Sequence, residues 1–212
     1  MTLLIALLLV LFAAAALLLL LRQRRRLESA RPPALEARHL FNLRIGDIVQ
    51  AQGRDWVVED RLLYEQPGGF QWLEYRLQDG SDSRWLSVCE DDELEISWLR
   101  SADPAALDNP QALRNAVPER LHWAGRAYRR IEKGAATLRA DARVMNRRVG
   151  LCTFADYEAV GAADGPDRLL SVEWWGGGGD PAGEIEMTVG DRLDAGALAL
   201  LPGDGRSVYR PQ

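Results

Sequence analysis

The sequence predicts a mostly β protein in which two related small β halves pack as a sandwich or barrel. A short connecting helix is expected between the halves and one transmembrane helix before them. Three observations lead to this prediction. Residues 2–21 are an uncharged apolar run, the apolar pattern after Phe41 has mostly period two, and four short motifs occur twice in the same order. Alternation over short runs is typical of half-buried strands.

The composition is that of a folded protein with a sizeable core. Of the 212 residues, 47% are hydrophobic and 27% are charged, and seven are tryptophan, which excludes a disordered chain. Two cysteines, Cys89 and Cys152, are too few for a disulfide framework and have no CxxC spacing. We expect them to be small buried hydrophobes and not a redox pair.

Residues 2–21 predict a single transmembrane helix that anchors the chain in the lipid bilayer. Twenty residues at about 1.5 Å rise each match a hydrocarbon core of about 30 Å. A secretory signal peptide would need a basic region before the apolar run, and none is present. The basic flank follows it, as Arg22, Arg24, Arg25 and Arg26.

The basic flank sets the expected orientation. Because basic flanks stay on the cytoplasmic side, we expect the N-terminus outside and the soluble domain in the cytoplasm, at the inner (cytoplasmic) membrane. The four arginines could also contact anionic headgroups. Residues 22–40 read as a basic juxtamembrane linker, since Pro32 and Pro33 forbid a continuous helix there.

Beyond the linker, short alternating runs are separated by turn residues, which predicts strands and hairpins. We expect a first β repeat over 41–100, a helical connector over 101–117 and a second β repeat with a C-terminal tail over 118–212. The repeated motifs pair Gly53–Trp56 with Gly125–Tyr128, Trp72–Tyr75 with Phe154–Tyr157, Arg84–Val88 with Arg168–Val172, and Glu93–Ser97 with Glu184–Thr188. Such an ordered set predicts an internal duplication around a pseudo-twofold axis.

Charge is unevenly distributed along the chain. Residues 41–100 carry 6 basic and 13 acidic side chains, residues 114–148 carry 10 and 3, and residues 149–212 carry 4 and 11. The basic stretch could face the acidic first half, the membrane surface or a nucleic acid. We favour the first two, because an acidic domain is repelled by phosphates, and expect no nucleic-acid partner.

Three motifs resemble those of a bacterial family known as domain of unknown function 4178. They are the pair Gly46–Asp47, the strand Trp72–Tyr75 and the pair Trp85–Leu86. The resemblance implies a small β domain that is often membrane-linked. It also implies gene neighbourhoods with membrane-stress proteins and polyamine-synthase-like enzymes.

The resemblance covers roughly residues 41–190 and is closer in the first half. In the second half Asp156 stands in place of the glutamate and Leu169 in place of the tryptophan. It implies no catalytic residues, because none are established for the family.

Glu74 and Asp156 occupy equivalent places in the two copies. If the pseudo-twofold axis brings them together, they would form an acidic, aromatic-lined pocket able to hold an organic cation or to raise one carboxyl pKa. The alternative is that each carboxylate pairs with a turn or with Arg84 or Arg168. The aromatic side chains expected to line the ligand site are Trp72, Tyr75, Phe154 and Tyr157.

Other short motifs predict no chemistry. The acidic run Glu90–Glu93 lacks the spacing of a calcium loop, and the run Gly176–Gly179 lacks the features of a phosphate loop. Trp174 and Trp175 could dock a partner or lipid, with at least one in the core. No grouping with His39 or His122 has metal spacing, so we expect neither a metal nor another cofactor.

These observations favour a non-enzymatic, single-pass membrane protein. The first hypothesis is a cytosolic β module acting as a binding or scaffold protein, with an unidentified protein partner and a role in envelope maintenance. The alternative is a binder or sensor of a small organic cation such as a polyamine. A hydrolase would require a base and a nucleophile in one pocket, and the sequence shows no such signature.

Overall fold

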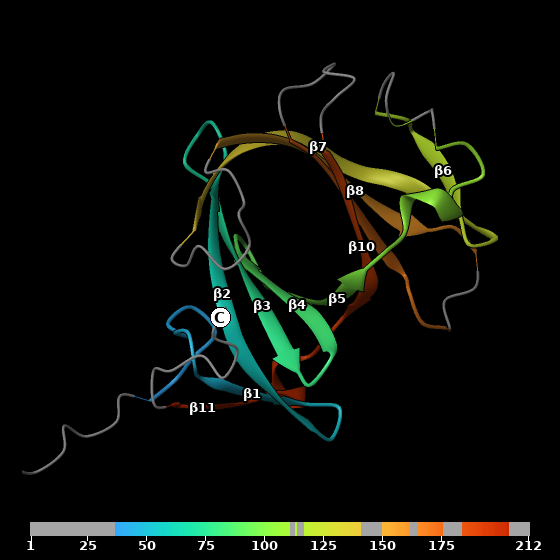
Figure 1. Ribbon diagram of the computed structural model, residues 1–212. Helices are drawn as coiled ribbons and strands as arrows, with labels where there is room; N and C mark the ends of the chain where they lie inside the picture. Colours follow the sequence, from blue (N-terminus) through green and yellow to red (C-terminus); the bar gives the residue numbers. More distant parts are fainter. Residues whose placement is uncertain are drawn as a thin grey trace, which may run out of the picture. The chain divides into compact units, whose positions relative to one another are not determined.

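The computed structural model describes residues 37–110, 113, 117–140, 150–161, 165–175 and 184–203 (Figure 1). Within these ranges no helix is both long and apolar enough to cross a membrane. The predicted transmembrane helix, its flanking arginines and most of the juxtamembrane linker lie outside the described residues.

The described residues are mostly strand, which confirms the predicted fold class. In chain order the strands are β1 (Ile48–Ala51), β2 (Arg54–Glu65), β3 (Gln71–Asp79), β4 (Asp82–Glu90), β5 (Leu94–Ser101), β6 (Arg120–Trp123), β7 (Arg126–Ala140), β8 (Gly150–Ala159), β9 (Leu169–Trp175), β10 (Glu184–Arg192) and β11 (Ala199–Leu201). Two 3-10 turns follow β5 and β10, namely η1 (Pro104–Ala106) and η2 (Ala195–Ala197).

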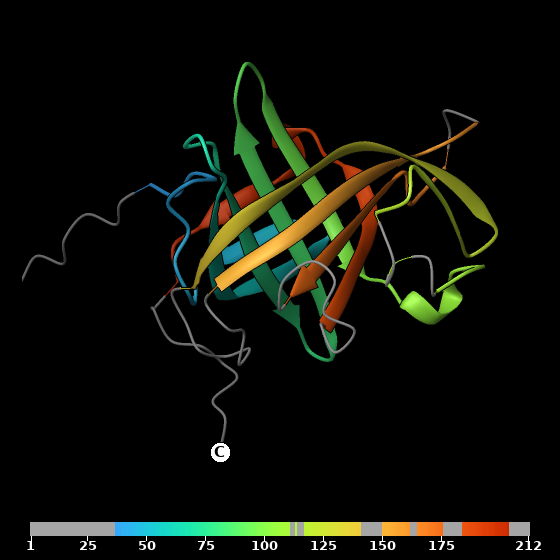
Figure 2. The same cartoon turned by 90° about the horizontal axis from the view of Figure 1, so that it is seen from above.

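Eight of these strands form a closed antiparallel ring. Its order is β2-β3-β4-β5-β10-β9-β8-β7, and it closes where Leu62–Glu65 of β2 pair with Thr137–Ala140 of β7. Of the two predicted architectures the ring is the barrel. Figure 1 looks along it, and Figure 2 shows β7 and β8, yellow and orange, running obliquely to β4 and β5 in green.

The long strands β2 and β7 each serve two pairings. The first part of β2 pairs with β1, and the first part of β7 pairs with β6, through tight two-residue turns. The turn residues Gln52–Gly53 and Ala124–Gly125 all have positive φ, which two-residue hairpin turns require. Each long strand also carries a bulge against its next neighbour, at Glu59 in β2 and at Ile131 in β7.

Alternation along the strands produces three apolar clusters. On β3, Leu73, Tyr75 and Leu77 join a first cluster built from β1 to β5. The corresponding cluster of the second half contains Tyr157 and Leu170. A third cluster takes residues from strands of both halves, so it lies on the inner face of the ring: Leu62, Tyr64, Trp85, Leu99, Ala136, Leu138, Cys152 and Phe154.

We call the first two clusters the outer clusters. Each of them is completed by a chain segment that follows the strands of the other half. After β5, Leu107 bridges to Trp123 of β6, and Leu107 and Leu113 pack in the second cluster. After β10, Leu198 and Leu200 pack against the first cluster, and β11 pairs with β1. The apolar surface of each half is therefore buried only when both halves are present.

A buried carboxylate fastens the two ends of the described domain. Asp47 is 1% exposed; its carboxylate pairs with Arg38 Nε at 2.6 Å and accepts from the backbone N–H of Gly203 at 2.8 Å. It also accepts from the N–H of Arg44 at 2.7 Å. A Cβ at Gly203 would lie 1.6 Å from the carbonyl oxygen of Gly46, so only glycine fits there. The Gly46–Asp47 motif is thus a structural clasp.

The segment predicted as a helical connector begins as a 3-10 turn. Asp103 caps η1, since its carboxylate accepts from Ala105 N at 2.8 Å. Asp194 caps η2 in the same way through Gly196 N. The later part of the connector includes residues outside the described ranges.

Candidate functional site

A small pocket opens on the inner face of the ring. Its enclosed volume is ≈ 10 Å³, set in a hollow of ≈ 270 Å³ that includes open solvent. That enclosed volume is at the lower limit for about one water molecule. The lining comes from β3, β4, β5, β9 and β10 and consists of Glu74, Trp85, Leu99, Ser171, Glu173, Glu186 and Thr188.

Two of the pocket's carboxylates lie directly opposite each other. Glu173 of β9 and Glu186 of β10 are register partners, and both line the pocket with Glu74 of β3. Like charges at directly opposed positions of an antiparallel pair repel each other, because their Cβ atoms are about 5 Å apart. Three carboxyl groups, those of Glu74, Glu173 and Glu186, therefore gather at the pocket.

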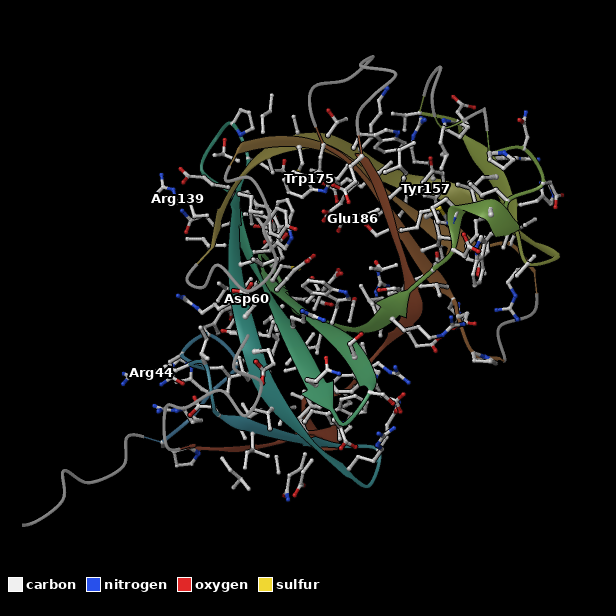
Figure 3. All side chains as sticks on the ribbon, in the orientation of Figure 1. Arg44, Asp60, Arg139, Tyr157, Trp175 and Glu186 are labelled. Carbon is white, nitrogen blue, oxygen red and sulfur yellow. The ribbon has the colours of Figure 1, made fainter. Side chains whose placement is uncertain are left out.

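Aromatic rings pack beside these carboxylates. Trp72 stacks on Tyr64 with a 4.7 Å centroid distance and meets Phe154 edge-on at 5.2 Å. The Tyr64 hydroxyl donates to Glu173 Oε2 at 3.3 Å, which joins the aromatic group to the pocket. Figure 3 shows Trp175 and Glu186 on the inner side of the ring.

Asp156 lies next to the pocket. It is the register partner of Ser171, whose hydroxyl hydrogen-bonds the Asp156 carboxylate. Burial raises the pKa of Asp156 to about 6, and the nearby carboxylates of Glu132 and Glu95 raise it further, against the opposing effect of the Ser171 hydrogen bond. The carboxyl group therefore titrates close to neutral pH.

The two cysteines have different surroundings. Cys152 is buried in the inner cluster, as expected, whereas Cys89 is partly exposed, and neither forms a disulfide. Burial, with Glu95, Glu132 and Asp156 nearby, raises the pKa of the Cys89 thiol to about 11. The thiol thus stays protonated at neutral pH, and a protonated thiol is a poor nucleophile.

Of the six residues that we predicted to line a ligand site, one lines the pocket and three lie near it. Glu74 lines the pocket, Asp156 reaches it through Ser171, and Trp72 and Phe154 pack together beside it. Because neighbouring residues of a strand point to opposite faces, the remaining two lie elsewhere. They are Tyr75 and Tyr157.

Tyr75 and Tyr157 are fully buried in the two outer clusters. The Tyr75 hydroxyl donates to the carbonyl of Leu40 at 2.7 Å, and that of Tyr157 donates to the carbonyl of Pro118 at 3.0 Å. Figure 3 places Tyr157 away from the inner side of the ring. These tyrosines pin chain segments onto the outer cores and do not line the pocket.

The arginines weighed as partners for the two carboxylates make other contacts. Arg84 donates to the carbonyl of Ser83 and lies over the Trp56 ring at 5.2 Å. Arg168 pairs with Glu158 at 3.7 Å.

Two other sequence features have plain structural settings. Trp174 donates to the carbonyl of Leu113 at 2.7 Å, and Trp175 packs against the inner cluster. In the part of the chain that the structure describes, no three or more His, Cys, Asp or Glu side chains are grouped as a metal site requires.

Sequence reasoning missed Glu173 and Glu186. The available signal was the alternation of each glutamate with apolar residues on its strand. Glu173 lies between Val172 and Trp174, and Glu186 lies between Ile185 and Met187. Their direct opposition depends on the β9–β10 register, which no local pattern specifies.

The ring, its two outer cores and its acidic pocket define an all-β protein with a closed antiparallel sheet. The chain belongs to the family described as domain of unknown function (DUF4178), whose model matches residues 44–195. This confirms the resemblance seen in the sequence motifs. A comparison with curated proteins found no match, and neither did one with solved structures.

Proposed function

We propose that this protein is a membrane-anchored binding module and that the ring pocket binds the ammonium group of an organic cation such as a polyamine. The observation that carries the proposal is the direct opposition of Glu173 and Glu186 beside Glu74 in one pocket. Carboxylates gathered in one pocket attract a cation, and opposed carboxylates repel each other less when a cation lies between them.

The size of the pocket favours a primary ammonium group. A –NH₃⁺ group is close in size to a water molecule and has three N–H donors, which suits a pocket with three carboxylates. The enclosed ≈ 10 Å³ corresponds to about one water-sized group, and a primary ammonium head is the organic cation closest to that size. The alkyl chain would extend into the wider hollow.

Aromatic and apolar side chains supply the rest of the recognition. Trp85 and Leu99 line the pocket, and each is at most 6% exposed. Aromatic faces attract cations, and apolar walls hold alkyl carbons away from water. The same setting offers no activated nucleophile, so we propose binding without catalysis.

The membrane setting of the proposal rests on the sequence. The apolar run 2–21 followed by Arg22–Arg26 supports a single-pass anchor with the ring in the cytoplasm at the inner membrane. An anchored binding module of this kind suits a scaffold role in envelope maintenance, with a protein partner still to be identified.

We further infer that the ring arose by duplication of one half. The two bulges, the two positive-φ turns and the two aspartate-capped 3-10 turns occur at matching places in the halves. The two halves meet at two strand pairings. Leu99 of β5 pairs with Gly190 of β10, and Glu65 of β2 pairs with Thr137 of β7. In each pair the two residues occupy equivalent positions in the two copies. A twofold axis that passes through both strand pairings requires this.

Isothermal titration calorimetry of the full chain in detergent micelles tests the binding proposal. Spermidine and n-butylamine are the probes, and tetramethylammonium is the matched cation without N–H donors. We expect saturable binding of the two amines and none of tetramethylammonium. Equal binding of all three, or of none, would contradict the proposal.

A pair of variants assigns the binding to the pocket. Glu186→Gln keeps the shape of the side chain and removes one charge from the pocket, so we expect at least tenfold weaker spermidine binding. Glu184→Gln, two residues away at the start of the same strand, is the matched control and should bind as the parent does. An equal effect of both changes would indicate attraction by general surface charge.

A further inference from the structure

A row of polar side chains leads from the pocket toward β7. Glu132 of β7, Asp156 of β8, Ser171 of β9 and Thr188 of β10 are successive register partners across four strands. Ser171 and Thr188 line the pocket, and Ser171 hydrogen-bonds Asp156. Asp156 is thus one hydrogen bond removed from the pocket.

We infer that binding of an ammonium group in the pocket is coupled to release of a proton from Asp156 through Ser171. This inference rests on the proposed function and adds a regulation to it. In the coupled step the Asp156 carboxyl loses its proton to water as the cation enters, so the bound positive charge and the released proton balance.

The hydroxyl of Ser171 explains how the two events communicate. When Asp156 is ionised, it accepts the Ser171 hydrogen, and the Ser171 lone pairs are available to accept from an ammonium N–H. When Asp156 is protonated, its O–H can donate to Ser171, whose hydrogen then turns toward the pocket. That hydrogen would face the N–H donors of the cation and oppose binding.

The surroundings place this switch in an accessible pH range. The groups that face Asp156 are Glu132 from β7, Glu95 from β5 and Cys89 from β4, and the last stays a neutral thiol. Arg192 of β10 lies 3.5 Å from Glu95 and moderates its charge. Burial and the two carboxylates hold the pKa of Asp156 at about 6.

The test is the pH dependence of n-butylamine binding to the full chain, measured by calorimetry at pH 5, 6 and 7. An alkylamine stays protonated throughout this range, since its pKa is near that of lysine, about 10.4. For a group with a pKa of about 6, binding should weaken about tenfold from pH 7 to pH 5. Buffers with different ionisation enthalpies should also report proton release on binding at pH 5.5.

Asp156→Asn is the decisive variant. It should still bind, with a Kd that changes less than twofold over the same pH range and with no proton release. Glu158→Gln, two residues further along β8, is the matched control and should keep the full pH dependence. Ser171→Ala should also lose most of it, which gives a second readout if the asparagine variant fails to fold.

The outcomes separate the two proposals. Binding that does not vary with pH, or pH dependence that persists in both Asp156→Asn and Ser171→Ala, would overturn the proton coupling and leave the binding function standing. Absence of n-butylamine binding at pH 7 in the parent protein would overturn both.

Discussion

Glu173 of β9 and Glu186 of β10 are register partners whose carboxylates line one pocket on the inner face of the ring. Two carboxylates at directly opposed positions of an antiparallel pair repel each other when both are ionised. Glu186→Gln should therefore raise the free energy of unfolding of the ligand-free protein by about 0.5 to 1 kcal/mol. Urea unfolding followed by tryptophan fluorescence measures this change, with Glu184→Gln as the control. A loss of stability would show that Glu186 makes a stabilising contact instead.

The stability of the ring should depend on pH through Asp156. Its pKa is raised to about 6 in the folded protein, so the folded state holds the proton more tightly than the unfolded state. The protonated Asp156 carboxyl group therefore stabilises the folded state. This contribution is complete below about pH 4 and is lost as the pH rises through 6.

Asp156→Asn removes this dependence. At pH 8 we expect the variant to be more stable than the parent by about 1 to 2 kcal/mol, less than the full shift implies because the side chain keeps some solvent contact. At pH 4 the two proteins should unfold at the same urea concentration. Equal stability at pH 8 would mean that Asp156 is ionised without cost.

The clasp at Asp47 should be important for stability. Asp47→Ala leaves Arg38 and the N–H groups of Arg44 and Gly203 without their buried acceptor. We expect a loss of about 3 kcal/mol in the free energy of unfolding, and faster hydrogen exchange in β11. Asp79→Asn, which alters the exposed pair with Arg54 at 2.6 Å, is the control and should change little. Similar losses in both variants would contradict the special role of the clasp.

The pairing between β5 and β10 requires glycine at position 190. A Cβ there would lie 2.0 Å from the carbonyl oxygen of Trp98, which belongs to the backbone and cannot move aside. Gly190→Ala should cost about 3 kcal/mol or more by overpacking. At Gly134 the atoms nearest to the added Cβ belong to the Phe154 side chain, at 2.9 Å, so Gly134→Ala should cost about 1 kcal/mol. Melting curves of the two variants measure these losses. A larger loss for Gly134→Ala than for Gly190→Ala would contradict the prediction.

Local patterns predicted the strands well, because alternation is specified by neighbouring residues. The run around Trp72–Leu77 is β3, and its counterpart around Phe154–Tyr157 is in β8. Closure of the ring could not be predicted in this way. It depends on the pairing of Leu62–Glu65 with Thr137–Ala140, which lie more than seventy residues apart.

The candidate site was only partly predictable for two reasons. Glu74 and Tyr75 are adjacent on one strand, so alternation already excludes them from a shared pocket, and the sequence interpretation did not apply that rule. The opposition of Glu173 and Glu186 comes from the β9–β10 register.

The position of the bound cation is the central claim of this account. In the full chain, with glutamate side chains labelled at Cδ with carbon-13, spermidine should shift the signals of Glu74, Glu173 and Glu186 saturably, with one midpoint equal to the calorimetric Kd. The signals of Glu90 and Glu93, at the β4–β5 turn, should not move with that midpoint. Shifts confined to the turn, or small equal shifts at every glutamate, would contradict a cation site inside the ring.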